Sequence, residues 1–162
     1  MKTRLNIYDM DGTITDSSHR YRTKRNDQGE TVIDLDHWIA NEHRALDDKE
    51  LPTIANLRQD IACSETIAVI ATARIACHLT KLWLSWANAI PDFLVGRRDR
   101  HDSRKGAELK IQGINKILDQ HRDIQEITIY EDNRSYLDEL TQYYRGRGYS
   151  VAPVYVSSQQ GY

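Results

Sequence analysis

The chain has 162 residues, of which 40% are hydrophobic and 28% are charged, and its net charge is −2 at pH 7. This length and composition are typical of a single globular domain with one core, so we expect one domain over residues 1–162. The near-neutral charge excludes a global basic field, so nucleic acid would have to be bound by a local patch.

The apolar periodicity predicts strands and helices that alternate along the chain. The first strand covers residues 3–9 and precedes a strongly polar stretch over residues 12–50. That stretch ends in a predicted helix, Leu35–Ala45, which Asp34 or Asp36 could cap. The elements expected after it are a helix at 52–62, a strand at 66–74, a helix at 77–90, a strand at 92–96, a helix at 104–120, a strand at 126–132, a helix at 134–146 and a strand at 149–156. The expected apolar side of the helix at 77–90 is formed by Leu79, Leu82, Trp83 and Trp86.

Alternating strands and helices indicate a parallel sheet with right-handed crossovers. Ligands of such sheets bind beyond the carboxyl ends of the strands. Three pairs of polar residues fall at such ends, namely Asp9 with Asp11, Thr72 with Arg74, and Glu131 with Asp132. The sequence therefore predicts one functional site at this edge of the sheet.

The residue types at these strand ends favour phosphoryl chemistry. Carboxylates supply the hard oxygen ligands that Mg²⁺ prefers. A carboxylate can also accept a phosphoryl group as a nucleophile, and Asp11, two residues after Asp9, is placed to protonate a leaving alcohol and then to activate water. Taken singly, these residues have simpler explanations: a solvated turn for Asp9 and Asp11, a strand residue for Thr72, and helix capping for the acidic pair at 131–132.

The segment "DMDGTITDS" resembles the first motif, Asp-x-Asp-Gly-Thr, of the haloacid dehalogenase (HAD) superfamily of Mg²⁺-dependent phosphohydrolases. "AVIATAR", a lysine in "DSRKGAELK" and "ITIYEDN" resemble its other motifs in order, and the likeness spans residues 4 to about 140. The resemblance implies an α/β fold, with three layers and a Rossmann-like parallel sheet that carries helices on both faces. It also implies a protein without a large cap, in which residues 14–50 form a flap or a minimal cap.

The resemblance also implies a role for each matching position. Asp9 becomes the nucleophile and a Mg²⁺ ligand, and Asp11 becomes the general acid and base, with its backbone carbonyl as a further metal ligand. Thr72 hydrogen-bonds to the transferring phosphoryl group, and Asp132, with or without Glu131, anchors Mg²⁺. A lysine neutralises the charge around Asp9.

Two lysines compete for that role. Lys110 belongs to a helix whose buried positions include Leu109 and Ile114, and its spacing from Asp132 leaves room for a helix and a strand, so we favour it over Lys105. Lys105 precedes a glycine, as in some members of the superfamily.

Other residues are expected to bind the substrate. The resemblance further implies that Gly12 allows the tight turn and that Thr13 stabilises it. Ala73 and Arg74 in "ATAR" resemble the "SGR" or "TGR" of polynucleotide 3′-phosphatases, where an arginine can grip a phosphate. His19 is a further candidate for substrate contact, and the basic stretches 17–25 and 96–105 could form a track for nucleic acid.

The function predicted from the sequence is a Mg²⁺-dependent phosphatase that acts on a nucleotide or on a polynucleotide 3′-phosphate end. The alternatives are a phosphatase for another small metabolite and a catalytically silent binding module with the same fold. Two cysteines and the lack of a long apolar run indicate a cytoplasmic protein without a membrane segment, and no feature indicates a stable protein partner.

Overall fold

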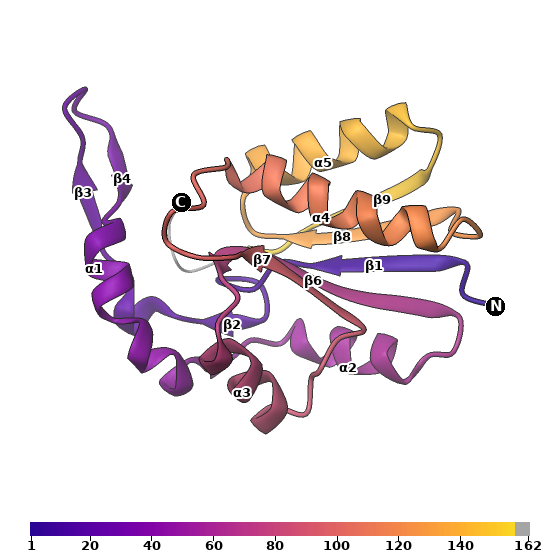
Figure 1. Ribbon diagram of the computed structural model, residues 1–162, viewed down its shortest axis with the longest axis horizontal. Coiled ribbons are helices and arrows are strands. Elements are labelled where there is room, and N and C mark those ends of the chain that lie inside the picture. The colour runs from indigo at the N-terminus through magenta and orange to yellow at the C-terminus, as the bar shows by residue number, and fades with distance from the viewer. Residues whose placement is uncertain (158–162) are drawn as a thin grey trace.

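Five parallel strands form the central sheet, in the order β7-β6-β1-β8-β9. The computed structural model describes residues 1–157, so the last five residues of the expected domain lie outside the described part (Figure 1). The strands are β1 (Arg4–Tyr8), β6 (Thr66–Ile75), β7 (Phe93–Arg97), β8 (Glu126–Glu131) and β9 (Ser150–Tyr155). Because β1 is central and pairs with β6 and β8, the ends of these three strands lie side by side.

Helices cover both faces of the sheet (Figure 1). On one face, α4 (Gly106–Gln120) and α5 (Arg134–Gly146) share a core with apolar residues of β1, β6 and β8. On the other face, α2 (Ile54–Ala62) and α3 (His78–Trp86) enclose a second core. The expected α/β fold, with a parallel sheet between two helical layers, is confirmed.

The strand sequences explain why both faces are covered. In β1, Leu5 and Ile7 belong to the core under α4 and α5, whereas Tyr8 belongs to the core under α2 and α3. The Tyr8 ring stacks on Tyr130 of β8 with the ring centroids 4.4 Å apart. The run from Thr66 to Ala71 in β6 is buried throughout, as expected for a central strand packed on both sides.

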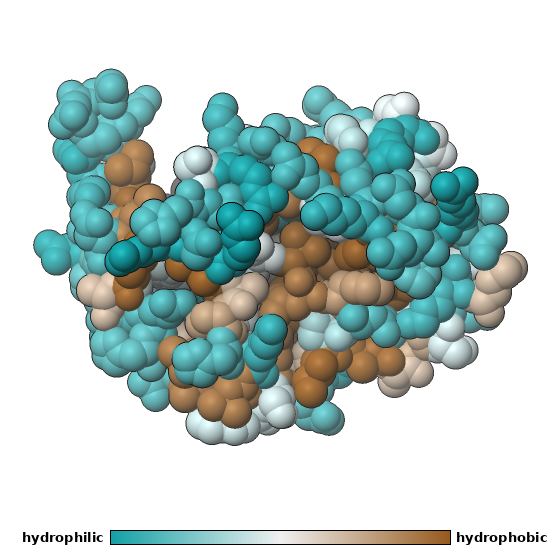
Figure 2. Space-filling model, in the orientation of Figure 1, coloured by the Kyte–Doolittle hydropathy of each residue, from teal (hydrophilic) through white to brown (hydrophobic). Residues whose placement is uncertain are grey.

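A polar insert separates β1 from α2. It consists of β2 (Thr15–Asp16), the 3₁₀ helix η1 (Ser18–Arg20), β3 (Thr23–Arg25), β4 (Thr31–Ile33), α1 (Leu35–Ala40), the 3₁₀ helix η2 (Glu42–Asp47) and β5 (Lys49–Glu50). Strands β2 and β5 pair and close the neck of the insert, while β3 and β4 form a hairpin. The insert stands beyond the carboxyl ends of the sheet strands (Figure 1), and the surface of its hairpin is hydrophilic (Figure 2).

The helix expected at Leu35–Ala45 is shorter in the structure. Asp34 caps its start by accepting a hydrogen bond from the backbone N–H of His37. The α-helix ends at Ala40, because the Asn41 side chain donates to the His37 carbonyl at 2.8 Å, and the chain continues as η2.

The expected apolar side of α3 was right for Trp83 but wrong for Leu82 and Trp86. The helix buries Thr80, Trp83 and Leu84, whereas Leu82 is 38% exposed and Trp86 is 65% exposed. Residues 80, 83 and 84 lie on one face of a helix, and 82 and 86 point away from it. Figure 2 shows hydrophobic side chains gathered along the lower edge of the molecule, where α3 lies.

Within residues 1–157, no helix is long and apolar enough to cross a membrane.

Candidate active site

The turn after β1 presents Asp9 and Asp11 at the edge of the sheet. The Asp9 N–H donates to the Tyr130 carbonyl at 2.9 Å, so Asp9 continues the pairing of β1 with β8. The chain then reverses at Gly12, whose φ of 81° is a left-handed conformation that favours glycine. The carbonyl of Met10 accepts from the N–H groups of residues 13, 14 and 15, which fixes the turn.

Lys110 lies between two buried carboxylates. Its ammonium group is 2.8 Å from Oδ1 of Asp9 and 2.5 Å from Oε2 of Glu131, and the lysine is 1% exposed. Lys110 shares the buried face of α4 with Ala107 and Ile114, so the helix itself aims the side chain at the strand ends. Lys105, by contrast, is exposed and precedes the first residue of the same helix.

Three carboxylates gather at this point. Oxygen atoms of Asp9, Glu131 and Asp132 all lie within 4.8 Å of one another, and all three residues are buried. Burial of Asp9, together with the charge of Glu131, raises its pKa to about 7 against the opposing effect of Lys110. A buried group of oxygen donors with this excess of negative charge fits a hard divalent cation such as Mg²⁺.

The carboxylate of Asp11 has other partners. It accepts a hydrogen bond from the Ser17 hydroxyl at 2.8 Å and is held on both oxygens by Arg74, with Nε 3.0 Å from Oδ2 and Nη2 bonded to Oδ1. Burial opposes ionisation of this carboxyl group, but Arg74, Arg20 and Ser17 together outweigh burial and lower the pKa of Asp11 below its ordinary value. The side chains of Asp9 and Asp11 therefore lie in different electrostatic surroundings.

The end of β6 contributes Thr72, Ala73 and Arg74. The register of β6 with β7 shifts between Ala71 and Ile75, and such irregularities redirect side chains near active sites. Thr72 is buried, and its hydroxyl oxygen accepts from the Arg74 N–H at 3.1 Å, so the hydroxyl proton is available to a ligand. Ala73 is half-buried.

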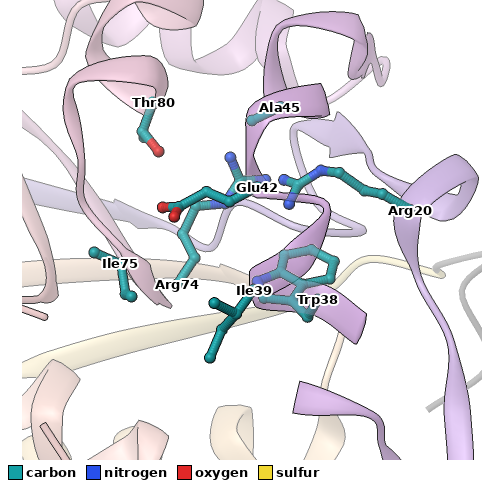
Figure 3. A pocket seen from close by; sticks show the side chains of 8 residues that line it. All are labelled: Arg20, Trp38, Ile39, Glu42, Ala45, Arg74, Ile75 and Thr80. Carbon is teal, nitrogen blue, oxygen red and sulfur yellow. The ribbon is translucent and has the colours of Figure 1, made fainter. Parts of the chain in front are cut away.

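Arg74, which we expected to grip a substrate phosphate, binds two carboxylates of the protein instead. Besides Asp11, its guanidinium group contacts Oδ2 of Asp48 at 3.0 Å. It also lines a narrow pocket between the insert and the core, together with Arg20 and Trp38 (Figure 3). In that view the guanidinium groups of Arg20 and Arg74 face each other near the Trp38 ring, and the Arg20 carbon Cζ is 4.0 Å from the centre of the ring.

Sequence reasoning missed Arg20 and Asp48. Arg20 is 1% exposed and donates to both oxygens of Asp48, at 2.8 Å each. Both lie in charged stretches of the insert, which resemble a solvated surface, and no pattern in the sequence marks them as buried.

The remaining candidates lie around this network. His19 contacts Oδ1 of Asp48 through Nε2 at 2.9 Å, rather than facing an open site. Thr13 is fully buried in the turn, and its hydroxyl has no hydrogen-bond partner among the described residues. Burial and the negative charge of Asp132 together raise the pKa of Tyr21 in the insert.

A family model described as Bacteriophage T5 5′-deoxynucleotidase matches residues 1–85, which is more than half of the chain. The matched residues include the Asp9–Asp11 turn, the whole insert and the end of β6. No curated protein matches the chain.

Proposed function

The chain belongs to the Bacteriophage T5 5′-deoxynucleotidase family, and from this premise we propose that it is a Mg²⁺-dependent phosphatase of the HAD type that acts on deoxynucleoside 5′-monophosphates. Membership of the family implies a nucleotide phosphomonoester hydrolase. The observation that carries the finer proposal is the position of Lys110, 2.8 Å from Asp9 inside a group of three carboxylates. A nucleophilic carboxylate beside a cation and a metal-binding group is an arrangement suited to phosphoryl transfer.

The proposed reaction has two steps. An oxygen of Asp9 attacks phosphorus, the bond between phosphorus and the 5′-oxygen breaks, and Asp11 gives a proton to the leaving oxygen. This role requires that the negative charge of the bound phosphate raise the pKa of Asp11, which Arg74 lowers in the free protein. Water then attacks phosphorus of the phospho-aspartate, Asp11 takes a proton from that water, and inorganic phosphate leaves as Asp9 is restored.

The other residues hold and neutralise charge in this scheme. Lys110 offsets the negative charge on Asp9 and on the phosphoryl group, and the Thr72 hydroxyl can donate to a phosphoryl oxygen. Asp9, Asp132 and Glu131 would hold Mg²⁺, with the Asp11 backbone carbonyl as a further ligand. When bound, the ion would stabilise the negative charge that develops on the phosphoryl oxygens.

The family name and the structure favour a nucleotide monomer over a polynucleotide 3′-phosphate end. The likeness to 3′-phosphatases rested on Arg74 as a phosphate ligand, but Arg74 is engaged with Asp11 and Asp48. The insert also stands over the edge of the sheet that holds the site, which suits a small substrate (Figure 1).

The test is phosphate release from a panel of substrates with Mg²⁺ or EDTA. The panel contains the four deoxynucleoside 5′-monophosphates, their ribose and 3′-phosphate counterparts, 3′-phosphorylated oligonucleotides and sugar phosphates. We expect Mg²⁺-dependent release from the deoxynucleoside 5′-monophosphates, loss of release in Asp9→Asn, and normal release in the exposed control Asp119→Asn. Phosphate release by Asp9→Asn at the rate of the unchanged protein would refute the assignment of Asp9 as the nucleophile. Release confined to oligonucleotides would refute deoxynucleoside 5′-monophosphates as the substrates.

A further inference from the structure

Four charged side chains form a buried network behind the site. Asp48 and Arg20 come from the insert, whereas Asp11 comes from the turn after β1 and Arg74 from the last residues of β6. The exposed fraction of the side chain is 0% for Asp48, 1% for Arg20, 4% for Arg74 and 12% for Asp11. Two carboxylates and two guanidinium groups balance in charge, so the network is neutral as a unit.

Asp48 stands at the centre of this network. Its Oδ1 accepts from Nε of Arg20 at 2.8 Å and lies 2.9 Å from Nε2 of His19. Its Oδ2 accepts from Nη2 of Arg20 at 2.8 Å and from Nη2 of Arg74 at 3.0 Å. Because the same Nη2 of Arg74 also bonds to Oδ1 of Asp11, the orientation of Arg74 is fixed between the two carboxylates.

The backbone of Asp48 is fixed as well. Its carbonyl accepts from the indole N–H of Trp83 in α3 at 2.9 Å. The next residue, Lys49, pairs with Asp16 across the neck of the insert. Asp48 is therefore held in place in three ways. Trp83 of α3 donates to its carbonyl, the pairing of β2 with β5 fixes the next residue, and the ion pairs fix its side chain.

A buried group of ions is seldom retained for stability alone. Taking charged groups out of water is costly, and well-packed apolar side chains often serve stability as well or better. What this network supplies is orientation, since Arg74 contacts both oxygens of Asp11 and the Arg20 Nη2 approaches the same carboxylate at 3.8 Å.

We propose that Asp48 is a positioning residue for Asp11. It holds Arg74 and Arg20 in the orientation in which they fix the Asp11 carboxylate, without touching the substrate itself. The insert is then a structural part of the catalytic apparatus. This inference rests on the proposed function, in which Asp11 transfers protons.

The proposal predicts an effect that depends on the leaving group. Departure of a nucleoside 5′-oxygen needs a proton from Asp11, whereas p-nitrophenolate leaves as a stable anion and needs none. The value of kcat/KM reports the step in which the leaving group departs. A misplaced Asp11 should therefore lower kcat/KM for hydrolysis of a deoxynucleoside 5′-monophosphate far more than kcat/KM for hydrolysis of p-nitrophenyl phosphate.

The experiment compares Asp48→Asn with Asp47→Asn, a control at the neighbouring exposed position. For Asp48→Asn we expect the ratio of kcat/KM for the deoxynucleotide to that for p-nitrophenyl phosphate to fall by about 10- to 100-fold, as for a displaced catalytic group. For Asp47→Asn the ratio should not change. An unchanged ratio in Asp48→Asn would overturn the proposal, whether kcat/KM falls equally for both substrates or for neither.

The ratio does not depend on how much of the variant is folded, because both substrates report on the same active fraction. If Asp48→Asn does not fold, the double variant Arg20→Gln/Asp48→Asn replaces the buried ion pair by neutral amides, and the same fall in the ratio is expected. The Asp9→Asn variant distinguishes a failure of the proposed function from a failure of the role proposed for Asp48. If it keeps full activity on both substrates, the proposed function fails, whatever the Asp48 variants do.

Discussion

Replacing Lys110 by methionine removes the ammonium group that lies between Asp9 and Glu131. The lysine is 1% exposed, with its nitrogen 2.8 Å from one carboxylate and 2.5 Å from the other. Removing one partner of a buried ion pair typically costs about 3 to 5 kcal/mol, because the remaining charge is left buried without compensation. Here three neighbouring carboxylates would remain, so we expect a loss in this range at neutral pH.

The assay is urea unfolding in EDTA, with Lys116→Met as the control on the same helix, where Lys116 is exposed. In a thermal-unfolding experiment on a domain of this size, the same loss of stability would lower the melting temperature by about 6 to 20 °C. The control should change stability by less than about 0.5 kcal/mol. Mg²⁺ should stabilise Lys110→Met more than it stabilises the unchanged protein, because the variant holds more uncompensated negative charge.

Activity gives an independent check of the same residue. With saturating Mg²⁺, we expect kcat of Lys110→Met to fall about 100- to 1000-fold, as for other groups that stabilise the charge of a transition state. If Lys110→Met and Lys116→Met unfold at the same urea concentration and release phosphate at the same rate, the assignment of Lys110 to the site is refuted.

Three further variants or conditions test other parts of the structure. In EDTA, the free energy of unfolding in urea should fall as pH rises from 5 to 7, because the folded-state pKa of Asp9, about 7, exceeds its ordinary 3.8. Mg²⁺ should flatten this pH dependence. A free energy of unfolding that does not change with pH in EDTA would contradict the raised pKa. Gly12→Ala should cost about 1 to 2 kcal/mol and also reduce phosphate release, whereas Gly29→Ala, with a φ of 77° in the exposed hairpin, should show only the stability loss. Trp83→Ala should cost about 3 to 5 kcal/mol in thermal unfolding and Trp86→Ala less than about 0.5 kcal/mol; equal losses would contradict the observed face of α3.

The position of Lys110 shows how much of the site can be predicted from the sequence. In a straight helix, residues 107, 110 and 114 share one face, and Ala107 and Ile114 are apolar, so a lysine at 110 falls on the buried stripe. A charged residue on such a stripe needs a partner, and the acidic strand ends supply one. The same local reasoning places Asp9, Thr72 and Asp132 together, because parallel strands bring their carboxyl ends to one edge.

The amphipathic pattern of α3 did not decide which side is buried. The helix carries Trp83 and Leu84 on one side and Leu82 and Trp86 on another, and each side offers apolar surface. The choice follows from the neighbours of the helix, including the Asp48 carbonyl that receives the Trp83 indole N–H. Those neighbours include residues of the insert, β1 and α2, which are distant from α3 in the chain.

The sequence by itself determined the order of strands and helices, the α/β class and the residues at the strand ends, because these depend on local periodicity and on the handedness of crossovers. Only the tertiary structure decided that Arg74 holds Asp11 and that Asp48 holds Arg74. These partners lie 63 and 26 residues apart in the chain. A charged residue has the same appearance in a sequence whether it faces water or another ion, so its burial depends on how the insert folds back onto the sheet.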